Sequence, residues 1–115
     1  MHIEIYKKRP DVNGIVHTHS PYSTGFAFSN KRIKRLEGFG EIKNPFLPYI
    51  EYEKPGSKEL AINASEGIGL DDVLILKKHG VICVGENLKE AESLAVFIEE
   101  SAKTLGRAAE QWYKK

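Results

Sequence analysis

The sequence has few of the features that mark secreted, membrane-bound or nucleic-acid-binding proteins. It has one cysteine among 115 residues, so no disulfide can form within the chain, and we expect a cytoplasmic protein. No apolar run approaches the roughly 18 residues that span a bilayer, and no apolar segment typical of a secretory signal follows the first residues. With 17 basic and 16 acidic residues the net charge is only +1, which predicts neither a nucleic acid nor a membrane as partner.

The residues that are present predict one small α/β domain over residues 1–115. A hydrophobic content of 41% is enough for a core, and no repeat, linker or low-complexity segment divides the chain. Apolar periodicity, turn residues and prolines predict a sheet covered by helices. We expect helices over residues 1–8, 21–28, 58–68 and 88–105, and strands over residues 13–19, 46–53 and on both sides of residues 78–80.

Several single residues refine this prediction. Ser57 is a good N-cap for the third helix, and Asn87 with Glu90 forms an approximate capping box for the last one. Pro48 predicts an edge position or a bulge for its strand. The Lys- and Glu-rich face of the last helix is expected to be solvated.

Three of the four histidines form a pattern that can bind a metal ion. His17 and His19 lie two residues apart in an expected strand, so their side chains project from one face and that of Thr18 from the other. Two imidazoles at this spacing can bind one Zn²⁺, which needs at least a third ligand. His79 precedes Gly80, where the backbone can turn tightly and present the ring to a cleft. Spacing alone is equally compatible with ordinary sheet and turn residues.

Two long segments resemble one known family. They are HIEIYKKRPDVNGIVHTHSPYSTGFA and LKKHGVICVGENLKEAESLAVFIEESAK, and the stretch PYIEYEKPGSKEL between them is also similar. In order and spacing these segments resemble the class II aldolase/adducin family, whose enzymes include metal-dependent aldolases and epimerases of phosphorylated sugars. The resemblance runs from end to end of the chain. It implies an α/β fold with a central, largely antiparallel β-sheet flanked by helices.

The resemblance also implies ligands and a chemistry. His17, His19 and His79 correspond to the family's ligands for Zn²⁺ or another divalent metal ion. The implied activity is retro-aldol cleavage of a phosphorylated ketose, such as L-fuculose 1-phosphate, to dihydroxyacetone phosphate and an aldehyde. An enzyme like L-ribulose-5-phosphate 4-epimerase, and a metal-binding member without activity, are the alternatives. The implied partners are a small phosphorylated sugar and further copies of the chain in a homo-oligomer, expected to be a tetramer.

The catalytic and substrate-binding residues stay unassigned. By resemblance, the family's catalytic acid and phosphate-binding loops fall before Met1, so we expect this chain to be the C-terminal portion of the family domain. Glu4 lies more than a helical turn from the position of that acid, and we assign it no catalytic role. His2 is expected to pack on the sheet, and Ser20 to cap the helix that follows it.

A basic stretch and the aromatic C-terminal tail are two further segments that could contact a partner. The basic stretch NKRIKR, residues 30–35, has no interleaved aromatic residues and is expected to be a solvated face rather than a nucleic-acid site. Trp112 and Tyr113 end a polar tail, where they are expected to contact another subunit or to fold back on their own core.

Overall fold

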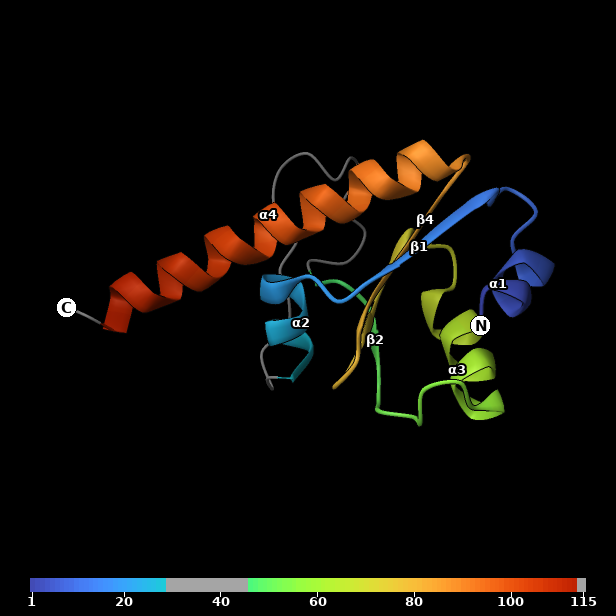
Figure 1. The fold of residues 1–115 in the computed structure, drawn as a ribbon, viewed down its shortest axis with the longest axis horizontal. Coiled ribbons are helices and arrows are strands. Elements are labelled where there is room, and N and C mark those ends of the chain that lie inside the picture. Colours follow the sequence, from blue (N-terminus) through green and yellow to red (C-terminus); the bar gives the residue numbers. More distant parts are fainter. Residues whose placement is uncertain (29–45, 114–115) are drawn as a thin grey trace.

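The computed structural model describes residues 1–28 and 46–113, with side chains up to residue 107. The basic segment 30–35 and the side chains of residues 112 and 113 lie outside these residues, so the predictions for them stay predictions. In the described part of the chain, one β-sheet has helices on both faces (Figure 1). The helices are α1 (His2–Lys8), α2 (Pro21–Phe28), α3 (Lys58–Ile68) and α4 (Leu88–Tyr113), and the strands are β1 (Gly14–Thr18), β2 (Tyr49–Ile50), β3 (Val73–Leu76) and β4 (Gly80–Gly85).

The sheet is mixed and mostly antiparallel, with the strand order β1-β4-β3-β2. β4 pairs antiparallel with β1 and with β3, while β2 joins β3 in parallel. The expected fold class is therefore confirmed. β2 is much shorter than the strand predicted over residues 46–53. Pro48 has no amide hydrogen and contributes only its carbonyl oxygen, which accepts a hydrogen bond from the Ile75 amide at 2.9 Å.

Alternation along the strands places side chains in two cores, one on each face of the sheet. Leu74 and Ile82 pack in the core that α1 and α3 cover, whereas Val73 and Val81 pack in the core that α2 and α4 cover. Figure 1 shows α1 and α3 together on one side of the sheet and α2 and α4 on the other. Because both faces are covered, β3 is a run of four buried apolar residues.

A buried arginine fastens the beginning of β1. Arg9 follows α1 and folds inward, so that its side chain is only 7% exposed. One of its guanidinium nitrogens donates to the carbonyl oxygens of Gly69 at 2.8 Å and Asp71 at 2.7 Å, and the other two donate to the Asp11 carboxylate. The connections from α1 to β1 and from α3 to β3 are thereby tied together at one end of the sheet.

The caps predicted for α3 and α4 are present, with one difference in the capping box of α4. Ser57 Oγ accepts a hydrogen bond from the Leu60 amide at 3.1 Å, and Asn87 Oδ1 accepts from the Glu90 amide at 2.8 Å. The Glu90 carboxylate accepts from the amide of Glu86 at 3.1 Å, so the capping box closes one residue earlier than predicted. None of the described helices is long and apolar enough to cross a membrane.

Candidate metal centre

The candidate ligands come together where β1 ends beside the turn between β3 and β4. In the β1–β4 pairing His17 lies opposite Ile82, and Thr18 lies opposite Val81. Ile82 and Val81 belong to opposite cores, so His17 and Thr18 point to opposite faces of the sheet, as predicted. His79 ends the β3–β4 turn and precedes β4 directly.

The three imidazole rings form a compact cluster. Their centroids are 4.8 Å apart for His17 and His19, 4.7 Å for His17 and His79, and 5.2 Å for His19 and His79. One nitrogen from each ring lies within 4.8 Å of the other two. Zn²⁺ binds imidazole nitrogens at about 2.0–2.1 Å, so nitrogens that share an ion are about 3–3.5 Å apart. Small rotations of the side chains would bring the three nitrogens from the observed spacing to the spacing that one shared ion requires.

Two nitrogens of this cluster are buried without a hydrogen-bond partner among the described residues: Nε2 of His17 and Nδ1 of His79. Buried polar atoms are nearly always paired, and a metal ion bound by these two nitrogens would supply the missing partner. Burial lowers the pKa of His17 from 6.5 to about 4, with smaller contributions from His79, His19 and His2. Burial, followed by the charge of His19, also lowers the pKa of His79. Both rings are therefore neutral at pH 7, the form that binds a metal ion.

The turn that carries His79 depends on its two neighbours in different ways. A Cβ atom on Gly80 would collide with the carbonyl oxygen of Thr18 and would lie 3.0 Å from Cδ2 of His19. Glycine therefore allows β1 and β4 to approach closely beside the cluster. The positive φ of the turn, 58°, belongs to Lys78, and this conformation is uncommon for a residue other than glycine. The prediction that Gly80 supplies the tight turn is wrong, since Gly80 supplies space and Lys78 adopts the turn conformation.

α2, which begins just after the histidine pair, is capped by a residue that the sequence reasoning missed. The amides of Tyr22 and Ser23 donate to the Glu99 carboxylate at 3.0 and 2.8 Å, and Ser23 Oγ donates to it at 3.0 Å. Ser20, the predicted cap, contributes its carbonyl oxygen to the first turn instead. One signal could have indicated this role. Glu99 directly follows Ile98, a buried residue of the apolar stripe of α4, so its carboxylate lies at the edge of that stripe, next to the elements that the helix packs against.

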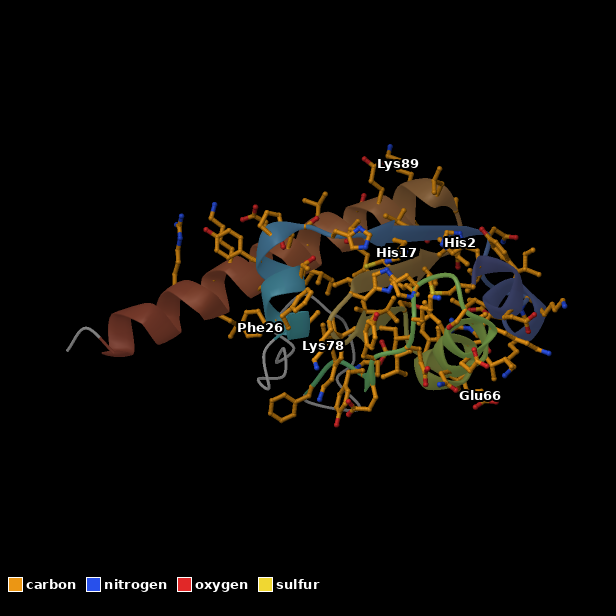
Figure 2. The ribbon with its side chains drawn as sticks, turned by 60° about the horizontal axis from the view of Figure 1, so that its bottom comes forward. His2, His17, Phe26, Glu66, Lys78 and Lys89 are labelled. Atoms are coloured by element: carbon orange, nitrogen blue, oxygen red, sulfur yellow. The ribbon has the colours of Figure 1, made fainter. Side chains whose placement is uncertain are left out.

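A cavity of about 700 Å³ opens beside the cluster. His17 and His79 form part of its wall, and the first turns of α1 and α3, with the residues that directly precede each helix, form the rest. His2 also lines this cavity and is exposed, so the prediction that it packs on the sheet is wrong (Figure 2). Glu4 pairs with Lys7 at 3.5 Å and does not line the cavity. A small molecule in the cavity would reach the histidine cluster directly.

Residues 1–105 match the family described as the Class II Aldolase and Adducin N-terminal domain, and this match covers most of the chain. The chain belongs to the class II aldolase and adducin family. The resemblance seen in the two histidine-containing segments is thereby confirmed, and with it the fold that the resemblance implied.

Individual members of the family define the extent of the similarity. An L-fuculose phosphate aldolase of Methanocaldococcus jannaschii is 41% identical over 103 residues, which are 90% of this chain and 56% of that protein. A 3-oxo-tetronate 4-phosphate decarboxylase of Escherichia coli is 28% identical over 109 residues, 90% of this chain and 51% of that protein. The crystal structure of a sugar-phosphate aldolase from Thermotoga maritima has a TM-score of 0.79 at 27% identity, over 96% of this chain and 52% of that chain. The chain thus spans about half the length of the curated relatives it matches.

Proposed function

We propose that the chain binds one divalent metal ion, Zn²⁺ in the first instance, through His17, His19 and His79. The observation that carries this proposal is the pair of buried ring nitrogens without a hydrogen-bond partner among the described residues. Neutral imidazoles suit Zn²⁺. Three protein ligands leave a fourth position for water or substrate, which is typical of catalytic rather than structural zinc.

We further propose that this site serves the retro-aldol cleavage of a phosphorylated ketose, such as L-fuculose 1-phosphate, to dihydroxyacetone phosphate and an aldehyde. When bound, the metal ion supplies Lewis-acid polarisation of a carbonyl group and stabilises the negative charge that develops there. The chain holds the three rings in place, and Leu60 and Ala61 give part of the cavity wall an apolar surface. The names of both relatives above denote phosphorylated compounds, which supports the substrate class.

Imine formation, the other route that aldolases use, has less support. It needs a lysine whose amine is activated by removal from water or by a neighbouring cation. Among the described residues that line the cavity, Lys58 is the only lysine, and it is exposed. The described residues therefore favour the metal-dependent route.

Metal content tests the ligand set. We expect about one zinc ion per chain after the protein is loaded with Zn²⁺ and desalted, and almost none in a His17→Ala/His19→Ala double variant. The matched control is His2→Ala, which removes the fourth histidine and leaves the cluster complete, so its zinc content should equal that of the wild type. Equal zinc content in the wild type and the double variant would contradict the assignment.

Product analysis tests the reaction. The decarboxylase relative favours a second candidate, the loss of carbon dioxide from a phosphorylated 3-oxo acid, which also develops negative charge beside a carbonyl group. Dihydroxyacetone phosphate with an aldehyde would identify an aldolase, carbon dioxide a decarboxylase, and an epimeric pentulose phosphate an epimerase. Zinc binding with none of these products would contradict the proposed activity and indicate an inactive metal-binding member.

Assembly and location remain predictions. We propose a homo-oligomer, a tetramer by analogy with the family, in the cytoplasm. Light scattering at micromolar concentration tests the assembly, and a clean monomer would contradict it.

A further inference from the structure

α2 connects the two segments that carry the candidate ligands. It begins two residues after His19, and near its other end the Ala27 carbonyl oxygen accepts a hydrogen bond from the Lys78 amide at 2.6 Å. Lys78 directly precedes His79 and has the positive φ of the turn. The position of His19 relative to His79 therefore depends on where α2 lies.

α2 needs support from the rest of the domain. It has only eight residues, and its first turn contains no acidic side chain. Isolated helices shorter than about 12–15 residues are marginal in water, and Gly25 inside the helix weakens it further. Its stability must come from tertiary contacts.

Glu99 supplies such a contact at the first turn. Its carboxylate accepts three hydrogen bonds from Tyr22 and Ser23, and Ser23 is only 1% exposed. A carboxylate at a helix N-terminus interacts favourably with the helix dipole, and its charge-assisted hydrogen bonds are stronger than neutral ones. Glu99 belongs to α4, which packs along β1 and β4, so the support comes from a well-anchored element.

We propose that Glu99 is a positioning residue for the histidine cluster, acting through α2 rather than as a ligand. By fixing the first turn of α2 it fixes the segment that follows His19. Through the bond between Ala27 and Lys78, the same helix fixes the turn before His79. The proposal rests on the proposed metal-binding function.

Glu99→Gln tests this role, because it removes the charge and keeps the shape of the side chain. We expect the affinity for Zn²⁺, measured by competition with a chromophoric chelator, to fall about tenfold, the lower end of the loss seen when residues that orient metal ligands are changed. The absorption spectrum of the Co²⁺-loaded protein should change as well, which a purely structural role would not cause. Glu100→Gln is the matched control, since Glu100 is the next residue and is exposed. Wild-type affinity and spectrum in Glu99→Gln would overturn the proposal.

A second variant applies if Glu99→Gln does not fold. Ser23→Ala removes one of the three hydrogen bonds to the carboxylate and leaves the two amide bonds in place. We expect a few-fold loss of Zn²⁺ affinity, in keeping with one hydrogen bond. Wild-type affinity in Ser23→Ala would overturn the proposal in that case.

The metal-free protein separates this proposal from the proposed function. In nuclear magnetic resonance spectra of the metal-free protein, Glu99→Gln should shift the ring signals of His19 and His79 and leave those of His2 unchanged. If the wild type binds no metal, the proposed function fails, and this measurement still decides the role of Glu99. Unchanged signals from His19 and His79 would overturn that role.

Discussion

The two ends of β1 both bury polar groups, but only one end pairs them within the described chain. At the beginning of the strand, Arg9 donates to two carbonyl oxygens and to the Asp11 carboxylate. At the other end, ring nitrogens of His17 and His79 are buried without such a partner. Pairing stabilises the fold, whereas an unpaired buried group destabilises it until a ligand binds. The hydrogen bonds of Arg9 at the first end stabilise the fold, whereas the ring nitrogens at the second end are available to bind a ligand.

The largest effect is expected at the paired end. Arg9→Met removes the hydrogen bonds to the carbonyl oxygens of Gly69 and Asp71 and those to the Asp11 carboxylate, and we expect a loss of about 3 kcal/mol in the free energy of unfolding. Lys8→Met is the control, because among the described residues Lys8 makes only a long ion pair, 3.8 Å, with exposed Glu66. It should change stability by less than about 0.5 kcal/mol. Urea unfolding measures both. Similar losses in the two variants would contradict the role of Arg9.

A slightly smaller effect is expected at the unpaired end, and only when metal is present. At a free Zn²⁺ concentration of 100 times the dissociation constant, binding to the folded chain should raise the free energy of unfolding by about 2.7 kcal/mol. Unfolding curves recorded with Zn²⁺ and with a chelator measure this difference. The His17→Ala/His19→Ala variant should show none of it. An equal zinc effect in that variant would place the ion elsewhere.

Sequence patterns predicted the features that depend on neighbouring residues. Ser57 and Asn87 cap their helices as expected, because capping involves residues within one turn. His17 and His19 share a face because side chains alternate along a strand. The positive φ at Lys78 had no such signal, since a lysine does not mark this conformation.

The features that depend on distant partners could not be read from local patterns. The two carbonyl acceptors of Arg9 lie 60 and 62 residues away, and Glu99 lies 76 residues from Ser23. His79 joined the histidine pair only through the family resemblance, because the strand register that places it beside β1 is a property of the folded sheet. Such contacts follow from tertiary structure, which periodicity does not encode.

The two ends should also respond to acid in different pH ranges. In the metal-free fold, burial lowers the pKa of His17 from 6.5 to about 4, so between these values the unfolded chain binds a proton that the folded chain does not. Stability should therefore fall as the pH drops from 6.5 towards 4. At the other end, the hydrogen bond from Arg9 lowers the pKa of Asp11 below 3.8. The contribution of the Asp11–Arg9 pair to the stability of the fold is therefore complete above pH 3.8. It is lost as the pH falls through the lowered pKa of Asp11.

Urea unfolding in the presence of a chelator, repeated over this pH range, tests the two windows. His17→Ala/His19→Ala should flatten the profile between pH 6.5 and 4 and leave the more acidic part unchanged. Arg9→Met should reduce only the loss below about pH 4, because it removes the cause of the lowered pKa of Asp11. The histidine effect should be modest, since the rings are partly exposed and solvent screens their charge. Identical pH profiles of stability in the two variants would show that the two ends of β1 do not respond to acid in different pH ranges.

The smallest effect concerns the backbone that presents His79. Lys78 has a φ of 58°, and the left-handed conformation costs a residue other than glycine roughly 1–2 kcal/mol. Lys78→Gly removes this strain, but glycine loses more conformational freedom on folding, which offsets about 0.5–1 kcal/mol of the gain. We therefore expect a net gain of about 0.5–1 kcal/mol in the unfolding free energy, while the hydrogen bond from this amide to Ala27 is kept. Lys78→Ala removes the same side chain and retains the strain, so it should show no gain. A glycine variant less stable than the alanine variant by about 0.5–1 kcal/mol would mean that the turn is unstrained, because only the conformational freedom that glycine loses on folding would then distinguish the two.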